Sequence, residues 1–255
     1  MSVESNVNVS EFIGDGGIYT GARLPSRTIS IICGYRKNGR AGNAKNQLYR
    51  ICRPKKAVTV RLVTPNNDVY ITGYCSSIST PPNNHPMVTQ IAVVCPDPYF
   101  KSTNDGNVQL YGSAACWEWI KNGTEFNDVE FGNAKTADIT ALQYDGDTEC
   151  GCKFIFTAKK VCQNPKIINI KTKETLSFTL DLQAGDVFTV NTRDGYKAAT
   201  LERDGVVTDC IGKLDLDSTF LKLAVGENKF KVVIDGADEH GIDIYCRFDV
   251  LIGGV

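Results

Sequence analysis

Histidine is scarce in this chain: its 255 residues include only His85 and His240, which are not spaced to share a metal ion. The sequence also has no G-x-S-x-G nucleophile motif and no glycine-rich phosphate loop leading into a helix. Enzyme catalysis needs a nucleophile, a base or a metal in a cleft. We therefore predict that the protein is not an enzyme, with no catalytic residues, no metal site and no cofactor.

Long apolar runs are also missing. No stretch of about 18 consecutive apolar residues occurs, so we expect no transmembrane helix and no membrane insertion. The first residues, Met1 to Asn6, show no basic segment followed by an apolar one, so we expect no secretory signal. These two features predict a protein that is made in a cytoplasm.

Cysteine, in contrast, is abundant, with ten residues. In a long chain without a secretory signal we expect free thiols rather than disulfides, because buried cysteine packs as a small apolar residue. Cys150 and Cys152 form the one close pair, whereas structural zinc sites usually need two such pairs. We therefore favour buried free thiols over a metal cluster that would include Cys162.

Period-two alternation of apolar and polar residues dominates the sequence and predicts an all-β protein with one short helix. Two of the clearest cases are residues 175–182 and 242–250. Turn sequences such as Asp194-Gly195 and Asp204-Gly205 separate the strands. The helix is expected over residues 43–53, before Pro54. Many short strands at near-regular spacing predict β-sandwiches or barrels.

The segment 88–100 suggests a division into two domains. An apolar strand, expected to be buried on both faces, runs into Pro96 and Pro98, which stop strand pairing. Tyr99 and Phe100 then offer an apolar surface for anchoring one domain against the next. We predict an N-terminal β domain over residues 1–108 and a C-terminal β-sandwich over residues 109–255. The last strand, within 242–255, belongs to the second domain or returns to the first.

Charge is distributed unevenly along the chain. Residues 1–100 contain 11 Lys and Arg against 5 Asp and Glu, and the remainder contains 17 against 24. The excess of positive charge lies between Arg36 and Arg61. It fits nucleic-acid contact, or a solvated or subunit-docking face, which we favour. The candidate interface residues are Arg50, Arg53, Lys55 and Lys56, together with Tyr99 and Phe100.

Other residues leave alternative functions open. Trp117 and Trp119 would share one face of a strand, where they could stack on a sugar or pack in a core or interface. They suggest a carbohydrate-binding module for host attachment. Paired carboxylates, Asp145 with Asp147 and Asp215 with Asp217, would suit a glycosidase, although acidic hairpin turns explain them better.

Several segments, taken in order, carry a resemblance to a known family. They are RTISI at 27–31, the predicted helix before Pro54, CPDPYF at 95–100, NPKIIN at 164–169, TKETL at 172–176, AGD at 184–186 and LAVGEN at 223–228. In this order they resemble the phage distal tail proteins, the baseplate hub components of long-tailed phages. The resemblance spans almost the whole chain. The many cysteines depart from the pattern without touching a functional position.

The resemblance implies a structural virion protein. Such proteins form a homo-hexameric ring with the N-terminal β domain, while a galectin-like β-sandwich projects outward. The ring joins the tail tube protein to the tail-associated lysin or fibre hub protein, and it can also carry receptor-binding proteins. DNA transits the ring without specific binding. The implied location is the phage tail tip, after assembly in the host bacterial cytoplasm.

Overall fold

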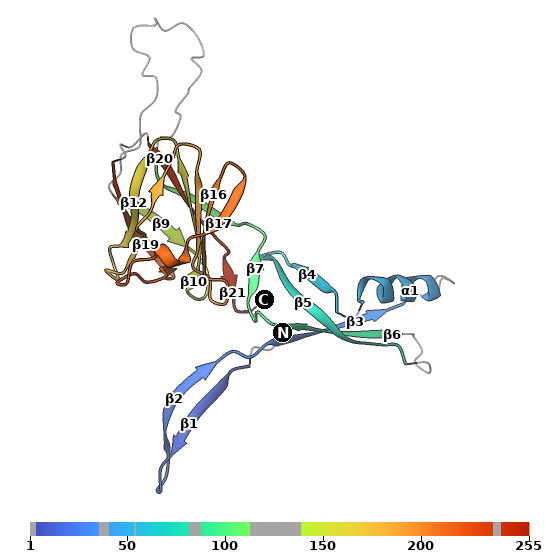
Figure 1. Ribbon diagram of the computed structural model, residues 1–255. Helices are drawn as coiled ribbons and strands as arrows, with labels where there is room; N and C mark the ends of the chain where they lie inside the picture. The colour runs from blue at the N-terminus through green and yellow to red at the C-terminus, as the bar shows by residue number, and fades with distance from the viewer. Residues whose placement is uncertain are drawn as a thin grey trace, which may run out of the picture. The chain divides into compact units, whose positions relative to one another are not determined.

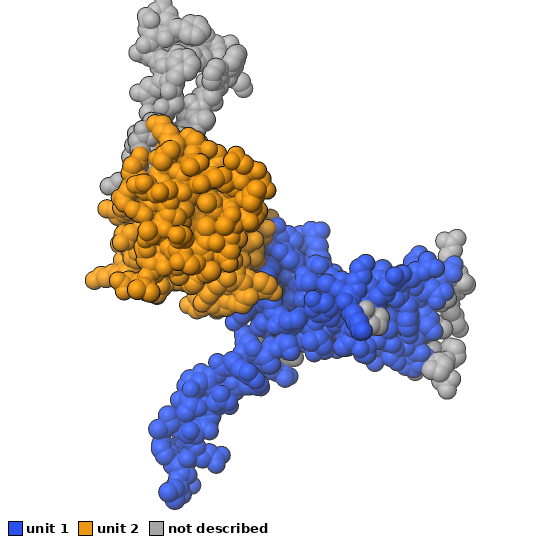
Figure 2. Space-filling view, viewed as in Figure 1, with its two compact units in different colours: residues 1–103, 251–255 blue, residues 104–250 orange. Residues whose placement is uncertain are grey.

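The chain is nearly all β-structure, and it separates into two compact units. The computed structural model describes residues 4–35, 41–53, 55–81, 88–112, 139–236 and 241–254. Unit 1 comprises residues 1–103 and 251–255, and unit 2 comprises residues 104–250 (Figure 2). The described helices are α1 (Ala41–Ile51) and a 3-10 turn at Ile211–Lys213. The prediction of an all-β protein with one short helix is confirmed.

Unit 1 contains a six-stranded antiparallel sheet and a separate two-stranded hairpin (Figure 1). The sheet has the order β21-β7-β5-β6-β3, and β4 also pairs with β5. Its strands are β3 (Arg27–Gly34), β4 (Ala57–Val63), β5 (Asp68–Ser79), β6 (Val88–Cys95), β7 (Phe100–Ser102) and β21 (Leu251–Ile252). The hairpin consists of β1 (Asn6–Glu11) and β2 (Gly17–Arg23).

The core of unit 1 lies on one face of this sheet. It is built from alternate residues of β3, β5 and β6, and Leu48 and Cys52 add the apolar side of α1 and of the residue after it. In β6, residues Thr89 to Cys95 are buried at every second position, and the positions between them are exposed or half-buried. The expectation that β6 is buried on both faces is therefore wrong. In this antiparallel sheet, α1 and the residue after it pack against one face of the strands, and the other face is not fully buried.

Both β6 and β7 pair with β5, on either side of an irregular segment that contains the two prolines. β6 pairs with the C-terminal half of β5, and β7 pairs with Val69 and Tyr70. The prolines interrupt the ladder, as the sequence predicts, but pairing resumes at Phe100. At Gly73, beside the interruption, an added Cβ would lie 2.6 Å from the carbonyl oxygen of Val94, so only glycine fits this close approach.

Arg27 connects three segments of unit 1. Its Nη2 donates a hydrogen bond to the carbonyl oxygen of Gly253 at 2.6 Å, just after β21. Its guanidinium carbon lies 5.1 Å from the ring centroid of Phe100, a cation–π distance. Phe100 itself is completely buried. The arginine that opens β3 thus ties together the start of β3, the start of β7 and the end of the chain.

Unit 2 contains two larger antiparallel sheets and one short strand pair. The first sheet has the order β17-β16-β15-β11-β20-β8, the second has the order β13-β12-β19-β9 with β14 also paired to β12, and β10 pairs with β18. The strands are β8 (Gly106–Tyr111), β9 (Ile139–Tyr144), β10 (Cys150–Gly151), β11 (Lys153–Ala158), β12 (Cys162–Asn169), β13 (Thr175–Ser177), β14 (Asp181–Leu182), β15 (Val187–Asn191), β16 (Ala198–Arg203), β17 (Val206–Asp209), β18 (Lys222–Leu223), β19 (Gly226–Asp235) and β20 (Ile242–Phe248).

Aromatic side chains join the two sheets into a β-sandwich. Phe154 of β11 meets Phe230 of β19 edge-on, with ring centroids 6.0 Å apart. Tyr144 of β9 meets Phe248 of β20 in the same way at 5.6 Å. All of these rings are buried, and edge-to-face contacts of this kind add to the stability gained by burying the rings.

The segment 242–255, where one last strand was expected, contains two strands in the structure. β20 pairs with β11 and β8 inside unit 2. The chain then continues into β21, which pairs with β7 in unit 1. Unit 1 is therefore made from two separate parts of the sequence, and unit 2 is made from the continuous stretch between them.

An ion pair with one deeply buried partner links the start of β15 to the end of β16 in the first sheet. The side chain of Asp186, just before β15, is 2% exposed and accepts hydrogen bonds from Nε and Nη2 of Arg203 at 2.9 and 2.6 Å. The backbone N–H of Gln183 also donates to this carboxylate at 2.7 Å. The guanidinium of Arg203, followed by the Gln183 N–H, holds the pKa of Asp186 below its usual range.

We predict that Phe188→Ala destabilises unit 2 by about 4 kcal/mol, because it leaves a cavity in the core. Phe188 is fully buried, and its ring centroid lies 5.0 Å from that of Phe178 and 5.5 Å from that of Phe156. Urea unfolding, monitored through hydrogen exchange of the β11 amides, measures the loss in the free energy of unfolding. The control Tyr196→Ala, at a 73% exposed residue, should change it little. Equal effects of the two substitutions would contradict this packing.

We also predict that unit 2 loses stability in acid through Asp186. Its pKa is lower when folded than the unfolded value of about 3.9, so the pair stabilises the fold above that value. This contribution disappears as pH falls through the folded pKa. In Asp186→Asn, calorimetry should show a lower midpoint at pH 7 and a weaker dependence on pH in the acid range. The exposed control Asp217→Asn should retain the full acid dependence, and parallel curves for Asp186→Asn and the unmodified protein would refute the assignment.

Candidate subunit interface

Four of the predicted interface residues gather where α1 ends. Arg50 lies in the last turn of the helix, where a cation interacts favourably with the helix dipole. Arg53, Lys55 and Lys56 follow in the turn that leads to β4, and all four side chains are exposed. Lys55 has a φ of 67°, and the N–H of Lys56 donates to the carbonyl oxygen of Arg53 at 3.3 Å. The local fold thus concentrates four positive charges on one short segment.

Apolar side chains accompany these charges. Tyr49 is 39% exposed and Ile51 is 60% exposed, while Leu48 and Cys52 point into the core. We call this surface the basic α1 end, and it consists of Tyr49, Arg50, Ile51, Arg53, Lys55 and Lys56. Exposed apolar side chains among exposed cations are a combination that also occurs in protein–protein interfaces.

The two predicted aromatic residues lie elsewhere in unit 1. Tyr99 is half-buried in the segment between β6 and β7, and its N–H donates to Oδ1 of Asp97 at 3.2 Å. Phe100 is buried in the core of unit 1, beneath Arg27. Phe100 therefore contributes to the stability of unit 1, and the structure does not bring this pair together with the basic α1 end.

The sequence interpretation missed the β1–β2 hairpin. Gly14, Gly16 and Gly17 lie where the two strands of this antiparallel pair are joined. Every residue of both strands is exposed except half-buried Gly21. A detectable signal was present, because Val7 and Val9 alternate with polar residues just before the glycines.

The hairpin is amphipathic. Val7 pairs with Ala22, and Val9 pairs with Tyr19, so these four side chains share one face. Val7 and Val9 are each 54% exposed, and Tyr19 is 63% exposed. The tip adds further apolar surface from Phe12 and Ile13. This apolar face has no covering element in the two-stranded sheet to which it belongs.

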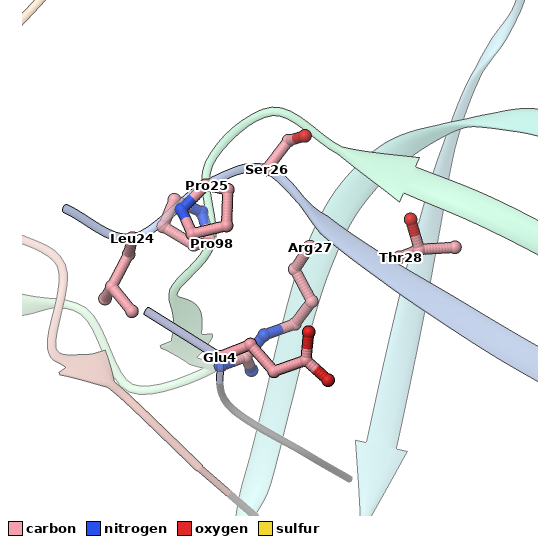
Figure 3. Close-up of a pocket in the computed structure, with 7 residues that line it drawn as sticks. All are labelled: Glu4, Leu24, Pro25, Ser26, Arg27, Thr28 and Pro98. Atoms are coloured by element: carbon pink, nitrogen blue, oxygen red, sulfur yellow. The ribbon is translucent and has the colours of Figure 1, made fainter. Parts of the chain in front are cut away.

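A shallow pocket of about 240 Å³ marks the base of the hairpin (Figure 3). Its lining consists of Glu4, Leu24, Pro25, Ser26, Arg27, Thr28 and Pro98. Glu4 and Arg27 are its charged groups, and Arg27 is already engaged with Gly253 and Phe100. The pocket therefore marks the junction between the hairpin and the sheet.

Asp215, from one of the acidic pairs considered for glycoside hydrolysis, has a structural role. Oδ1 of Asp215 accepts a hydrogen bond from the Thr179 hydroxyl at 2.6 Å, and its other oxygen accepts one from Ser177. These two bonds, Ser177 first, lower the pKa of Asp215. A glycosidase general acid needs a raised pKa, so this carboxylate acts instead as a fixed acceptor that ties Asp215 to the end of β13 and the residues after it.

Most of the described cysteine side chains are buried. The nine cysteines in the described residues are unbridged, and seven of them are buried. Burial raises the pKa of Cys150 to about 11, and burial with neighbouring Cys152 raises the pKa of Cys246. The thiolate is the reactive form, so these side chains behave as apolar packing residues.

Some predicted residues cannot be placed. Trp117, Trp119, His85 and His240 lie outside the described residues, so the sugar-stacking hypothesis stays a prediction. Within the described part of the chain, no group of three or more His, Cys, Asp or Glu side chains is arranged to hold a metal ion. No helix in that same part is both long and apolar enough to cross a membrane.

Comparison with solved structures shows a shared fold. The chain is similar to the Dit protein of phage SPP1, whose crystal structure is described as a paradigm of the hub adsorption apparatus in phages that infect Gram-positive bacteria. The TM-score is 0.66 at 10% identity, covering 98% of this chain and 89% of that one. A chain of the phage P2 baseplate in its activated conformation with Ca has a TM-score of 0.47 at 11% identity, covering 96% and 86%.

No curated protein sequence matches the chain. Residues 145–246, however, match the family model of the siphovirus-type tail component, C-terminal domain. This stretch carries strands β10 to β19 and most of β20, which together form most of the sandwich of unit 2. The resemblance to phage distal tail proteins is thereby confirmed, and residues 145–246 are similar to the C-terminal domain of the siphovirus-type tail component.

Proposed function

We propose that this protein is the hub at the distal end of a long phage tail. In this role six copies form a ring through unit 1, and unit 2 projects outward as a galectin-like sandwich. The observation that carries the proposal is the combination of a tail-component domain at residues 145–246 with a fold shared over 98% of the chain with the SPP1 Dit protein. That related protein is itself described as a hub.

The two units suit different parts of this role. Unit 2 buries large aromatic side chains between its own sheets, as a self-sufficient domain does. Unit 1 leaves an apolar hairpin and a basic α1 end uncovered. Large exposed apolar surfaces usually mark protein–protein contacts. Unit 1 therefore supplies the surfaces for assembly, and unit 2 supplies a stable body outside them.

The proposed partners follow from this position. On one side the ring joins the tail tube protein, and on the other it joins the tail-associated lysin or fibre hub protein. Receptor-binding proteins attach to the outward units, and DNA transits the ring without specific binding. The protein assembles in the host cytoplasm and functions in the virion. Its work is mechanical, because affinity comes from buried contact area rather than from reacting groups.

Electron cryo-microscopy of tails from particles that contain this chain tests the proposal. We expect six copies around the tail axis at the distal tip, with unit 1 lining the ring and unit 2 outside it. A tag inserted at Leu216, which is fully exposed in a loop of unit 2, should add density on the outside. Tails in which this chain lies elsewhere, or forms no closed ring, would refute the proposal.

A further inference from the structure

In an isolated subunit the β1–β2 hairpin lacks the packing contacts that would stabilise it. Isolated two-stranded hairpins are at best marginally stable in water. Here nearly every strand residue is exposed, and the tip residue Ile13 is fully exposed. Soluble proteins rarely leave a contiguous apolar surface of this kind uncovered. In the part of the chain that the structure describes, the apolar face of Val7, Val9, Tyr19 and Ala22 is exposed, as expected of a surface that another molecule covers.

The charges near the hairpin limit what that covering surface can be. Residues 4–23 carry three carboxylates, on Glu4, Glu11 and Asp15, against the single guanidinium of Arg23. All three acidic residues are exposed. The hairpin thus combines exposed apolar side chains with a net negative charge, and it would bind best to a surface with exposed apolar side chains and a net positive charge.

The basic α1 end has that complementary character. It presents Tyr49 and Ile51 as exposed apolar groups. Its exposed cations are Arg50, Arg53, Lys55 and Lys56, and residues 41–56 contain no Asp or Glu. The hairpin and the basic α1 end are both exposed in the same chain, so they do not cover each other within one copy.

We propose that the β1–β2 hairpin of one copy docks on the basic α1 end of a second copy. The inference rests on the proposed hub function, because a contact between two different surfaces of identical subunits is the kind that closes a ring. Each subunit then gives a hairpin to one neighbour and receives a hairpin from the other. Apolar contact supplies the affinity, and the opposite charges set the orientation of docking.

Nucleic acid is the other partner that the basic α1 end could take. The β1–β2 hairpin favours a protein partner for itself, because Val7, Val9 and Phe12 need an apolar surface that a phosphate backbone does not provide. Ile51 is exposed and lies between Arg50 and Arg53 in the sequence, which also favours a protein partner for the basic α1 end. Binding of duplex DNA to the full chain that is lost with the α1 cations, without any self-association, would overturn the proposal.

Photo-crosslinking of the full chain locates the docking site. We place a benzophenone amino acid at Ile13 and mix this light-isotope chain with an unmodified heavy-isotope chain. Mass spectrometry should find crosslinks from the light chain to the heavy peptide that contains Tyr49 to Lys56. The control probe at Leu216, equally exposed in unit 2, should not reach that peptide. Crosslinks from Ile13 to another region, or only within one chain, would overturn the proposal.

A charge exchange tests the contact independently. Glu11→Lys with Asp15→Lys should weaken self-association at least about tenfold, and so should Arg50→Glu with Arg53→Glu, because each turns attraction into repulsion. A chain with all four substitutions should recover most of the loss, as measured by analytical ultracentrifugation. Circular dichroism checks that each variant is folded. Additive losses without recovery, or a chain that stays monomeric at all concentrations, would overturn the hairpin contact.

The two proposals can fail separately. A six-fold ring at the tail tip in which the hairpin contacts a different protein would retain the hub and reject the hairpin contact. Crosslinks between Ile13 and the basic α1 end in purified chain, together with a different location in the tail, would retain the contact and reject the hub.

Discussion

A β-sheet with apolar residues on one face must cover that face, and the two units meet this requirement differently. In unit 2 a second sheet does so, with Phe154 against Phe230 and Tyr144 against Phe248. In the described residues of unit 1 there is a six-stranded sheet, one helix of eleven residues and an uncovered hairpin. The first solution produces a self-contained sandwich. The second leaves surface whose burial depends on other molecules, which is the property expected of an assembling subunit.

Local residue patterns predict much of this fold. The alternation around Leu176 and through residues 242–248 gives the correct faces, because the side-chain period of a strand is two. The helix was expected at 43–53 and lies at Ala41–Ile51. Pairings between distant segments are not local properties. The resumption of pairing at Phe100 and the return of β21 to β7 depend on Arg27 and Gly253, more than 200 residues apart.

Only part of the candidate interface could be predicted from the sequence. The cluster from Arg50 to Lys56 is evident because charge is read directly from composition. The hairpin is not, because Val7 and Val9 look the same whether they lie in a core or in solvent. Phe100 illustrates the converse, since an aromatic residue beside a strand break suggested an interface and proved to be a core residue. Exposure is a property of the fold, and no short window of sequence contains it.

The division of unit 1 between both parts of the chain has a consequence for its order of synthesis. Strand β21 completes the sheet of unit 1, and Gly253 provides the carbonyl oxygen that accepts the hydrogen bond from Arg27. Both emerge from the ribosome only after the whole sandwich of unit 2 has been translated. A nascent or prematurely terminated polypeptide would lack the closing strand. Such fragments would offer an unfinished sheet to their neighbours, so incorporation into a particle would select for full-length translation products.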